Sequence, residues 1–347
     1  MSEISMIGFD TAKNVFQACC LDRHGSVVKN LRLKRRQVLE FFEKMAACTV
    51  ALEACGSSYH WARQIAGLGH AVKLVPPPFL KRFLNGHKND ARDAHALALA
   101  GGDGMLRPVP VKSEEEQAQL MGFKVRSLLV RQYTQASNSL RGQLAEFGLT
   151  ANAGAKGLET LIARIETGVV TLPAQAVAAV AVLTRHWRAL GFEIAKLTAA
   201  LNLQIKGNER IQRLMTVPGV GPVTASVCAA KLGDPSRFAC GRDFAAWLGL
   251  TPKQQSSGQK RRLASITKAG DEDLRSLLVL GAAAVLIRTK RKRDNADPWA
   301  AAILKRRPFK VAAVALAARN ARTLWAILKN GSVYEPRRDK TLTLHHA

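Results

Sequence analysis

The chain has 347 residues, enough for two or three domains that each bury an apolar core. Lysines and arginines number 52 against 26 aspartates and glutamates, which gives a formal net charge of +26 and indicates a polyanionic partner, most simply nucleic acid. The sequence has no apolar stretch of membrane-spanning length and no signal peptide, so we expect a cytoplasmic protein without a membrane partner.

The first part of the chain predicts strands that alternate with helices. Strands are expected at residues 4–9, 15–21 and 27–33, which form a meander, and again at 49–52 and 71–75; helices are expected at 37–45 and 59–66. Three consecutive prolines at 76–78 predict a break. This alternation is typical of an α/β layer in which helices pack on a mixed sheet.

Two long helical stretches are expected next, at 113–147 and 173–215. Apolar residues recur at helical spacing in both, for example Leu140 and Leu144 in the first. A glycine-rich turn at 154–157 is expected between them, so the two stretches predict an antiparallel coiled arm. Such an arm can serve as a spacer or as a dimerisation and nucleic-acid-bracing element, and helical periodicity fits both roles equally.

The rest of the chain predicts a compact, mainly helical region. Helices are expected at 223–232, 244–248, 271–287, 298–305 and 309–328, with a polar loop at 251–260. The predicted organisation is therefore an α/β domain at 1–110, a helical arm at 111–206, an all-α domain at 207–332 and a charged tail at 333–347. The six cysteines lack the paired spacing of a zinc site, and we interpret them as reduced core residues.

Four acidic residues form the first candidate site. Asp10 and Glu53 end two predicted strands, where ligands collect in α/β sheets, and Asp90 and Asp93 lie on one face of a predicted helix start. Carboxylates that converge in this way repel one another unless a divalent cation neutralises them, and hard oxygen ligands select Mg²⁺ or Mn²⁺. Singly, each acid is more simply a helix cap, a turn former or a surface acid; together they predict a metal site for phosphoryl transfer.

Two further patterns suit contacts with phosphate. Gly219 and Gly221 lie in Pro-Gly-Val-Gly between two predicted helices, which resembles a helix-hairpin-helix turn whose backbone N–H groups can approach a phosphate. The alternative is a tight turn with no ligand. The other candidate contacts are basic residues, either close to the acids or in two clusters near the C-terminus: Lys13, Lys260, Arg261, Arg262, Arg288, Lys290, Arg291, Lys292 and Arg293.

Ser256 and Ser257 precede the first of these clusters. A serine hydroxyl is a poor nucleophile without an activating base or metal, and Ser-Ser-Gly alone is most often a flexible loop. No histidine lies between His186 and His345, so a local histidine base for these hydroxyls is absent from the sequence around them.

Taken together, these segments resemble the DEDD transposases of insertion sequence family 110, a family that includes the Piv invertase. The N-terminal signature is matched at residues 7–16, 53–57, 60–63 and 88–94, and the C-terminal signature at 218–222, 245–252 and 256–258. The match runs in order along nearly the whole chain.

The resemblance implies a RuvC-like first domain of the ribonuclease H type, with Asp10, Glu53, Asp90 and Asp93 as metal ligands, followed by a coiled arm and a transposase domain. It also implies that Ser257 is the nucleophile that forms a covalent link with DNA, and that a structured bridge RNA pairs with donor and target DNA. Ser256 adjoins Ser257, and the choice of Ser257 rests only on aligning the Ser-Gly pair with that of the family.

Three hypotheses follow. The first is an Mg²⁺-dependent recombinase, working as a homodimer or homotetramer, that cleaves and exchanges strands through Ser257. The second is a junction-resolving nuclease in which metals activate water, which explains the acids but not the serine. The third is a non-catalytic architectural protein that binds DNA or RNA, which explains the charge but not the acids.

Overall fold

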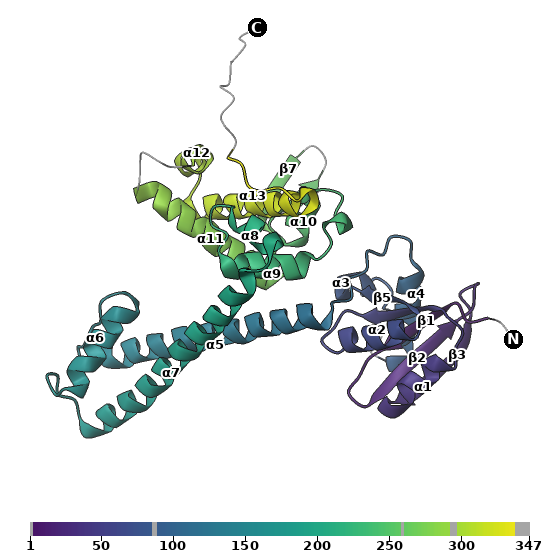
Figure 1. Cartoon of the computed structure of the whole chain (residues 1–347), viewed down its shortest axis with the longest axis horizontal. Helices are drawn as coiled ribbons and strands as arrows, with labels where there is room; N and C mark the ends of the chain where they lie inside the picture. The colour runs from purple at the N-terminus through teal and green to yellow at the C-terminus, as the bar shows by residue number, and fades with distance from the viewer. Residues whose placement is uncertain (1–2, 85–88, 258–259, 292–296, 337–347) are drawn as a thin grey trace, which may run out of the picture. The chain divides into compact units, whose positions relative to one another are not determined.

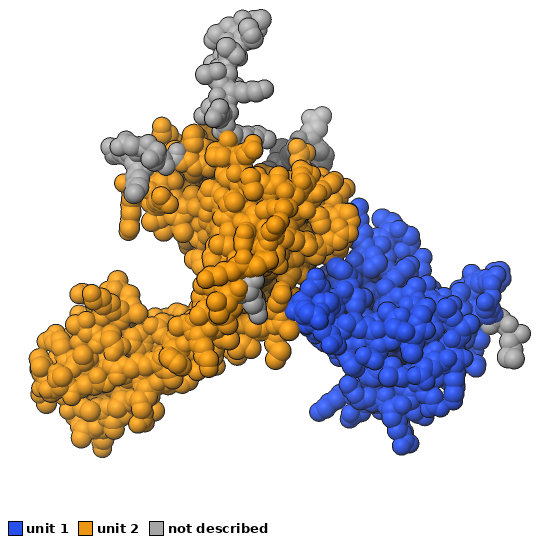
Figure 2. Space-filling model, in the orientation of Figure 1, with its two compact units in different colours: residues 1–117 blue, residues 118–347 orange. Residues whose placement is uncertain are grey.

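A computed structural model describes residues 3–84, 89–257, 260–291 and 297–336, with only the backbone described at 204, 255–257 and 260–263. The chain divides into two compact units, Met1–Gln117 and Ala118–Ala347, which are coloured separately in Figure 2.

Unit 1 contains a five-stranded mixed sheet (Figure 1). Its strands are β1 (Met6–Asp10), β2 (Val15–Leu21), β3 (Val27–Lys34), β4 (Thr49–Glu53) and β5 (Ala71–Val75), in the spatial order β3-β2-β1-β4-β5. The first three strands are antiparallel neighbours, whereas β4 is parallel to β1 and β5 is parallel to β4. The predicted mixed sheet is therefore confirmed.

Helices cover both faces of this sheet. On one face α1 (Val38–Glu43) and α2 (Ser58–Gly67) contribute Phe42, Trp61 and Ile65 to a core with the strand residues Phe9 and Phe16. On the other face α4 (Asp90–Gly102) packs its alanines and Leu97 on the strands. The expected break at the prolines is instead the short helix α3 (Pro77–Leu80), because proline is tolerated in the first turn of a helix.

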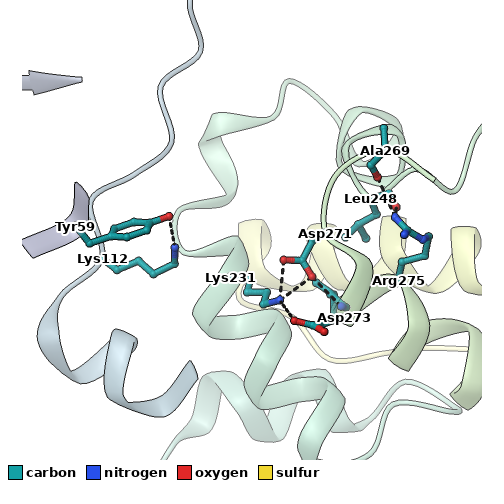
Figure 3. Close-up of polar contacts among 9 residues, drawn as sticks. Tyr59, Lys112, Lys231, Leu248, Ala269, Asp271, Asp273 and Arg275 are labelled. Atoms are coloured by element: carbon teal, nitrogen blue, oxygen red, sulfur yellow. Dashed lines mark hydrogen bonds and ion pairs between the residues drawn. The ribbon is translucent and has the colours of Figure 1, made fainter. Parts of the chain in front are cut away.

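The segment after α4, which is the last part of unit 1, is held against the rest of the unit by hydrogen bonds. The backbone N–H of Val109 donates to the Leu74 carbonyl oxygen at 2.8 Å, which extends the pairing beside β5. Lys112 Nζ donates to the Tyr59 hydroxyl at 2.6 Å, and its ammonium lies 3.9 Å from the centroid of the same ring (Figure 3). These contacts fix the end of unit 1 before the next helix begins.

Three helices follow: α5 (Glu114–Ala145), α6 (Gly154–Glu166) and α7 (Ala174–Ile205). In unit 2, α5 and α7 run antiparallel, because Tyr133 stacks on Trp187 at 5.2 Å while Arg126 Nε donates to Thr198 Oγ1 at 2.8 Å. The expected turn at 154–157 is wrong: these glycines open α6, whose leucines and isoleucines pack between the long helices. Gly154 has a φ of +84°, which supplies the sharp entry into that helix.

The rest of unit 2 is a helical core with one hairpin. Its elements are α8 (Glu209–Met215), α9 (Pro222–Leu232), α10 (Gly241–Trp247), β6 (Pro252–Ser257), β7 (Lys260–Ile266), α11 (Glu272–Arg291), α12 (Pro298–Arg306) and α13 (Phe309–Asn330). The expected helix at 173–215 is interrupted at 206–208, where the Asn208 side chain caps α8. The expected polar loop at 251–260 is wrong, since it forms most of the β6–β7 hairpin.

A buried ion cluster joins helices of unit 2. Lys231 of α9, whose side chain is 8% exposed, donates to both Asp271 carboxylate oxygens at 2.7 Å and to Asp273 at 3.2 Å (Figure 3). The ammonium also lies 5.9 Å from the ring centroid of Phe123 on α5. Loss of Asp271 would leave the buried Lys231 ammonium with the more distant and more exposed Asp273 alone, so this cluster constrains how α5, α9 and α11 pack.

Helix α13 is long and apolar enough to span a membrane by length and composition alone, contrary to the expectation from sequence. Half of its most apolar window is buried, and Leu316, Ala317 and Leu324 belong to the core of unit 2. Its apolar character is therefore accounted for by packing in this core.

Candidate functional site

Three of the four predicted metal ligands come together. Asp10, Asp90 and Asp93 each offer one carboxylate oxygen, and these oxygens all lie within 4.8 Å of one another. Asp10 is the last residue of β1, and the two other aspartates lie in the first turns of α4. Glu53 is not in this group, but it ends β4 beside Asp10, because β1 and β4 pair in parallel at Phe9 and Leu52.

The glycine at position 8 allows α4 to approach β1. A Cβ atom at Gly8 would lie 1.9 Å from the Ala94 carbonyl oxygen and 2.4 Å from the Ala98 nitrogen, so only glycine fits between strand and helix. Alternate strand residues share a face, which puts Asp10 on the same face as Gly8. Direct backbone contact therefore brings the first turns of α4 to Asp10.

The start of α4 is held by asparagines. Asn89 is its N-cap and accepts a hydrogen bond from the Ala91 N–H at 3.0 Å, so capping does not use the carboxylate of Asp90. Asn30 of β3 donates to the Ala91 carbonyl oxygen at 3.3 Å, linking the helix to the far strand of the sheet. The carboxylates of Asp90 and Asp93 are therefore left to converge with that of Asp10 from a helix end that other residues hold.

A cleft of about 1080 Å³ opens beside the cluster. It is lined by all four acids and by Cys55, Lys81 and Arg92, among others. Burial alone would raise the pKa of the Cys55 thiol, but hydrogen bonds with the Thr11 and Ser57 hydroxyls and with the backbone at Ser57 and Ser58 together outweigh it and hold that pKa below its usual value. Carboxylates and hydroxyls are the donor set of a hard divalent cation, so the cleft can hold a metal together with a phosphate.

Gln17 adds an amide next to the acids. It pairs directly with Asp10 across β1 and β2, it is 6% exposed, and it is hydrogen-bonded to Asn30. Its Oε1 is buried, and among the described residues no hydrogen-bond partner reaches it. An orphaned oxygen beside a carboxylate cluster suits a site that takes up a hydrated cation.

The β6–β7 hairpin of unit 2, which contains Ser256 and Ser257 and is called the serine hairpin below, is fixed at its neck, where the chain enters and leaves it. Arg275, which is 9% exposed, donates from Nη1 to the carbonyl oxygens of Leu248 and Ala269, both at 3.0 Å (Figure 3). These two carbonyls precede and follow the hairpin. A Cβ atom at Gly249 would lie 2.4 Å from the Ala269 oxygen, and one at Gly270 only 1.8 Å from the Trp247 oxygen. The two ends of the hairpin therefore touch through their backbones.

The predicted nucleophile lies near the tip of this hairpin. Ser257 is the last residue of β6 and pairs with Lys260, and Ser256 pairs with Arg261. The side chains of both serines and of Lys260, Arg261 and Arg262 lie outside the described part of the chain.

Comparison with known proteins assigns the chain to a family. Residues 7–148 match a transposase family model, and residues 211–297 match the model described as "Transposase IS116/IS110/IS902 family". A "Probable family 20 transposase" of Pseudomonas aeruginosa is 45% identical, covering 96% of this chain and 99% of its own length. The chain belongs to the IS110 family of transposases.

Other relatives support the same assignment. The transposase of insertion sequence element IS1111A from Coxiella burnetii is 36% identical to this transposase, over 96% of this chain and 92% of its own. A more distant relative is the pilin gene-inverting protein of Moraxella bovis, at 23% identity over 80% and 82% of the two chains. The chain is therefore a DNA transposase, and DNA is its partner.

The glycine turn of the transposase is packed against α11. Gly219 has a φ of +85°, and a Cβ atom there would lie 2.7 Å from the Gly281 carbonyl oxygen. The Asn320 side chain donates to the Pro218 carbonyl oxygen at 3.0 Å. The close packing of Gly219 on α11 explains why this position is a glycine, and no ligand is needed to explain it. Gly221, in contrast, is exposed at the N-cap of α9.

The predicted basic contacts are exposed where they are described. Lys13 lies after β1, and Arg288, Lys290 and Arg291 lie in the last turn of α11. Lys292 and Arg293 fall outside the described residues.

Sequence reasoning missed Gly8 and Arg275. A lone glycine inside an apolar strand is the signal for close backbone approach, and it was available at position 8. Arg275 gave no such signal, because an arginine in the first turns of a helix is usually solvated.

Proposed function

We propose that this transposase cleaves and rejoins DNA strands through a covalent serine intermediate, in a reaction that needs a divalent cation held by Asp10, Asp90 and Asp93, with Glu53 as a fourth ligand. The observation that carries the proposal is the convergence of the three aspartate oxygens within 4.8 Å. Mg²⁺ suits this all-carboxylate set, and Mn²⁺ can replace it. When bound, the cation neutralises charge on the reacting phosphodiester.

The bond changes involve Ser257. Its hydroxyl oxygen attacks phosphorus and forms a phosphoserine ester, while the bond from phosphorus to one bridging oxygen breaks. The hydroxyl proton is released to solvent, and the departing oxygen takes up a proton. Because an ester replaces an ester, the hydroxyl of another strand can reverse the step and join that strand without an external energy source.

The proposed setting is a DNA complex in the cytoplasm. A mixed sheet with an antiparallel meander followed by parallel β4 and β5 supports a ribonuclease H type fold for unit 1. The net charge of +26 supports contact with several phosphate backbones, so we propose that donor and target DNA and a structured bridge RNA bind a dimer or tetramer. In this proposal the antiparallel helices α5 and α7 form the arm that braces the assembly.

A junction-resolving nuclease is the second candidate. The carboxylate cluster alone would suffice for it, since metal-bound water would replace the serine. The two mechanisms differ in whether protein becomes attached to DNA.

The test is capture of that attachment. Full-length protein, purified together with its co-expressed RNA, is incubated with labelled DNA carrying the element's end and with Mg²⁺, quenched in denaturant and resolved by size. We expect a covalent protein–DNA adduct that disappears in Ser257→Ala and remains in the neighbouring control Ser256→Ala. Cleavage without any adduct would favour the nuclease, and an adduct formed by both variants would place the nucleophile elsewhere.

A further inference from the structure

Three arginines meet where α10 packs on α13. The backbone of Gly241 lies against Arg322, since a Cβ atom at Gly241 would be 3.1 Å from both the Cα and the carbonyl oxygen of Arg322. Arg242 is the next residue after that contact, and Arg319 lies one helical turn before Arg322 on α13. The junction of these two helices therefore gathers three guanidinium groups within one part of unit 2.

Among the described residues, one ion pair reaches these three guanidinium groups, from Asp297 to Arg319. Asp297 lies 3.5 Å from Arg319, but its Oδ1 also caps α12 by accepting from the Trp299 and Ala300 N–H groups. In the described ranges of the chain, neither Arg242 nor Arg322 forms an ion pair. Partial desolvation of its guanidinium lowers the pKa of Arg322, although the residue as a whole is exposed, and repulsion from Arg242 and Arg319 lowers it further. A bound anion would relieve this repulsion.

The cluster adjoins a cavity that can admit such an anion. A cavity of about 620 Å³ is lined by Arg319 and Arg322 together with Thr323 and Trp299, and two acids, Asp297 and Glu335, also line it. Arg242 lies outside this lining, next to Gly241, whose backbone packs on Arg322. Arg319 is already engaged, because its guanidinium lies over the Trp299 ring at 4.9 Å as well as beside Asp297. Arg242 and Arg322 are exposed, so they are the members that can donate to a ligand.

We propose that Arg242 and Arg322, supported by the charge of Arg319, form a binding site for a backbone phosphodiester of a nucleic-acid strand. Guanidinium groups match the paired oxygens of a phosphodiester, and several positive charges around one site favour a polyanion over a neutral ligand. The proposal deepens the proposed function, on which the class of partner rests, by adding a contact remote in sequence from the basic clusters at 260–262 and 288–293.

The experiment compares two double variants of the full-length protein. Arg242→Gln with Arg322→Gln removes the proposed donors. The matched control, Lys305→Gln with Lys310→Gln, removes two exposed charges at the end of α12 and the start of α13. Binding of labelled duplex DNA, single-stranded DNA and single-stranded RNA of equal length is measured by anisotropy over a range of salt concentrations.

We expect the arginine variant to weaken binding of at least one of the three probes by about tenfold, and to lower the salt dependence by about one released cation, while the control changes affinity by less than about twofold. The probe that is affected identifies the strand as DNA or RNA. Equal effects of the two double variants on all three probes would overturn the proposal.

Two features keep the result interpretable. Arg242→Lys with Arg322→Lys keeps the charge and should retain more binding than the glutamine pair, so a failure of the glutamine pair to fold would not leave the site untested. The readout is affinity and not strand cleavage. Wild-type protein that binds but forms no adduct would therefore count against the proposed mechanism alone, whereas an arginine variant indistinguishable from the control would count against this site alone.

Discussion

The carboxylate cluster of unit 1 and the serine hairpin of unit 2 are held in place by partly different contacts. The cluster depends on the absence of a side chain at Gly8, which lets α4 lie directly on β1. The hairpin has close backbone contacts at Gly249 and Gly270 and, in addition, one buried guanidinium, Arg275, which donates to the carbonyls before and after the hairpin. Both sites are therefore sensitive to volume added at a glycine, and the hairpin is sensitive to lost hydrogen bonds as well.

The largest effect is expected from Gly8→Ala. The added methyl group would overlap the Ala94 carbonyl, so α4 must move away from β1 and carry Asp90 and Asp93 away from Asp10. We expect a loss of about 3 kcal/mol in the free energy of unfolding, measured by urea denaturation, together with weakened Mn²⁺ binding.

The matched control for this change is Gly67→Ala. Gly67 is the last residue of α2, and a Cβ atom there has no atom within 4 Å. The free energy of unfolding of Gly67→Ala should be unchanged or slightly higher than that of wild type. If Gly8→Ala behaves like this control, close packing of α4 on β1 is not what assembles the cluster.

A smaller effect is expected from Arg275→Ala, which tests how the serine hairpin of unit 2 is held. Two carbonyls would lose their charged donor, which should lower the free energy of unfolding by about 2 kcal/mol. The two ends of the hairpin should then separate more often. Hydrogen exchange at the Lys268 N–H, which is bonded to the Gly249 carbonyl oxygen at 3.1 Å, should accelerate.

Further readouts separate this effect from general unfolding. Mn²⁺ binding by unit 1 should be unchanged in Arg275→Ala, while adduct formation falls. Guanidinium ion at low millimolar concentration should restore part of the adduct by occupying the vacated space. Normal exchange at Lys268 together with full adduct yield would show that Arg275 does not hold the neck.

The sequence predicted best where the pattern was local. Strands that alternate with helices, and an Asn-Asp-Ala-Arg-Asp helix start, led to the sheet and to the clustering of Asp10, Asp90 and Asp93. Glu53 was expected in the same cluster and lies outside it, although it lines the cleft. The spacing of residues along the chain predicts that Glu53 ends a strand, but it does not predict whether the longer glutamate side chain places its carboxylate next to the three aspartates.

Prediction failed where tertiary contacts decide the structure. The hairpin at 252–266 is built from glutamine, serine, lysine and arginine, which lack the apolar alternation of a strand, and its ends are held by Arg275 and two glycines. The glycines at 154–157 read as a turn, but the apolar residues that follow bury a helix against α5 and α7. In both places packing with distant residues outweighs local propensity.

The central claim is that the aspartate cluster binds the divalent cation on which strand cleavage depends. Its most direct test is Mn²⁺ binding to the full-length protein, followed by electron paramagnetic resonance, for wild type, Asp90→Asn and the control Glu43→Gln, an exposed acid of the same unit. We predict that Asp90→Asn weakens binding at least about tenfold and abolishes the DNA adduct while the control matches wild type. Wild-type Mn²⁺ affinity in Asp90→Asn, with adduct still formed, would contradict the account.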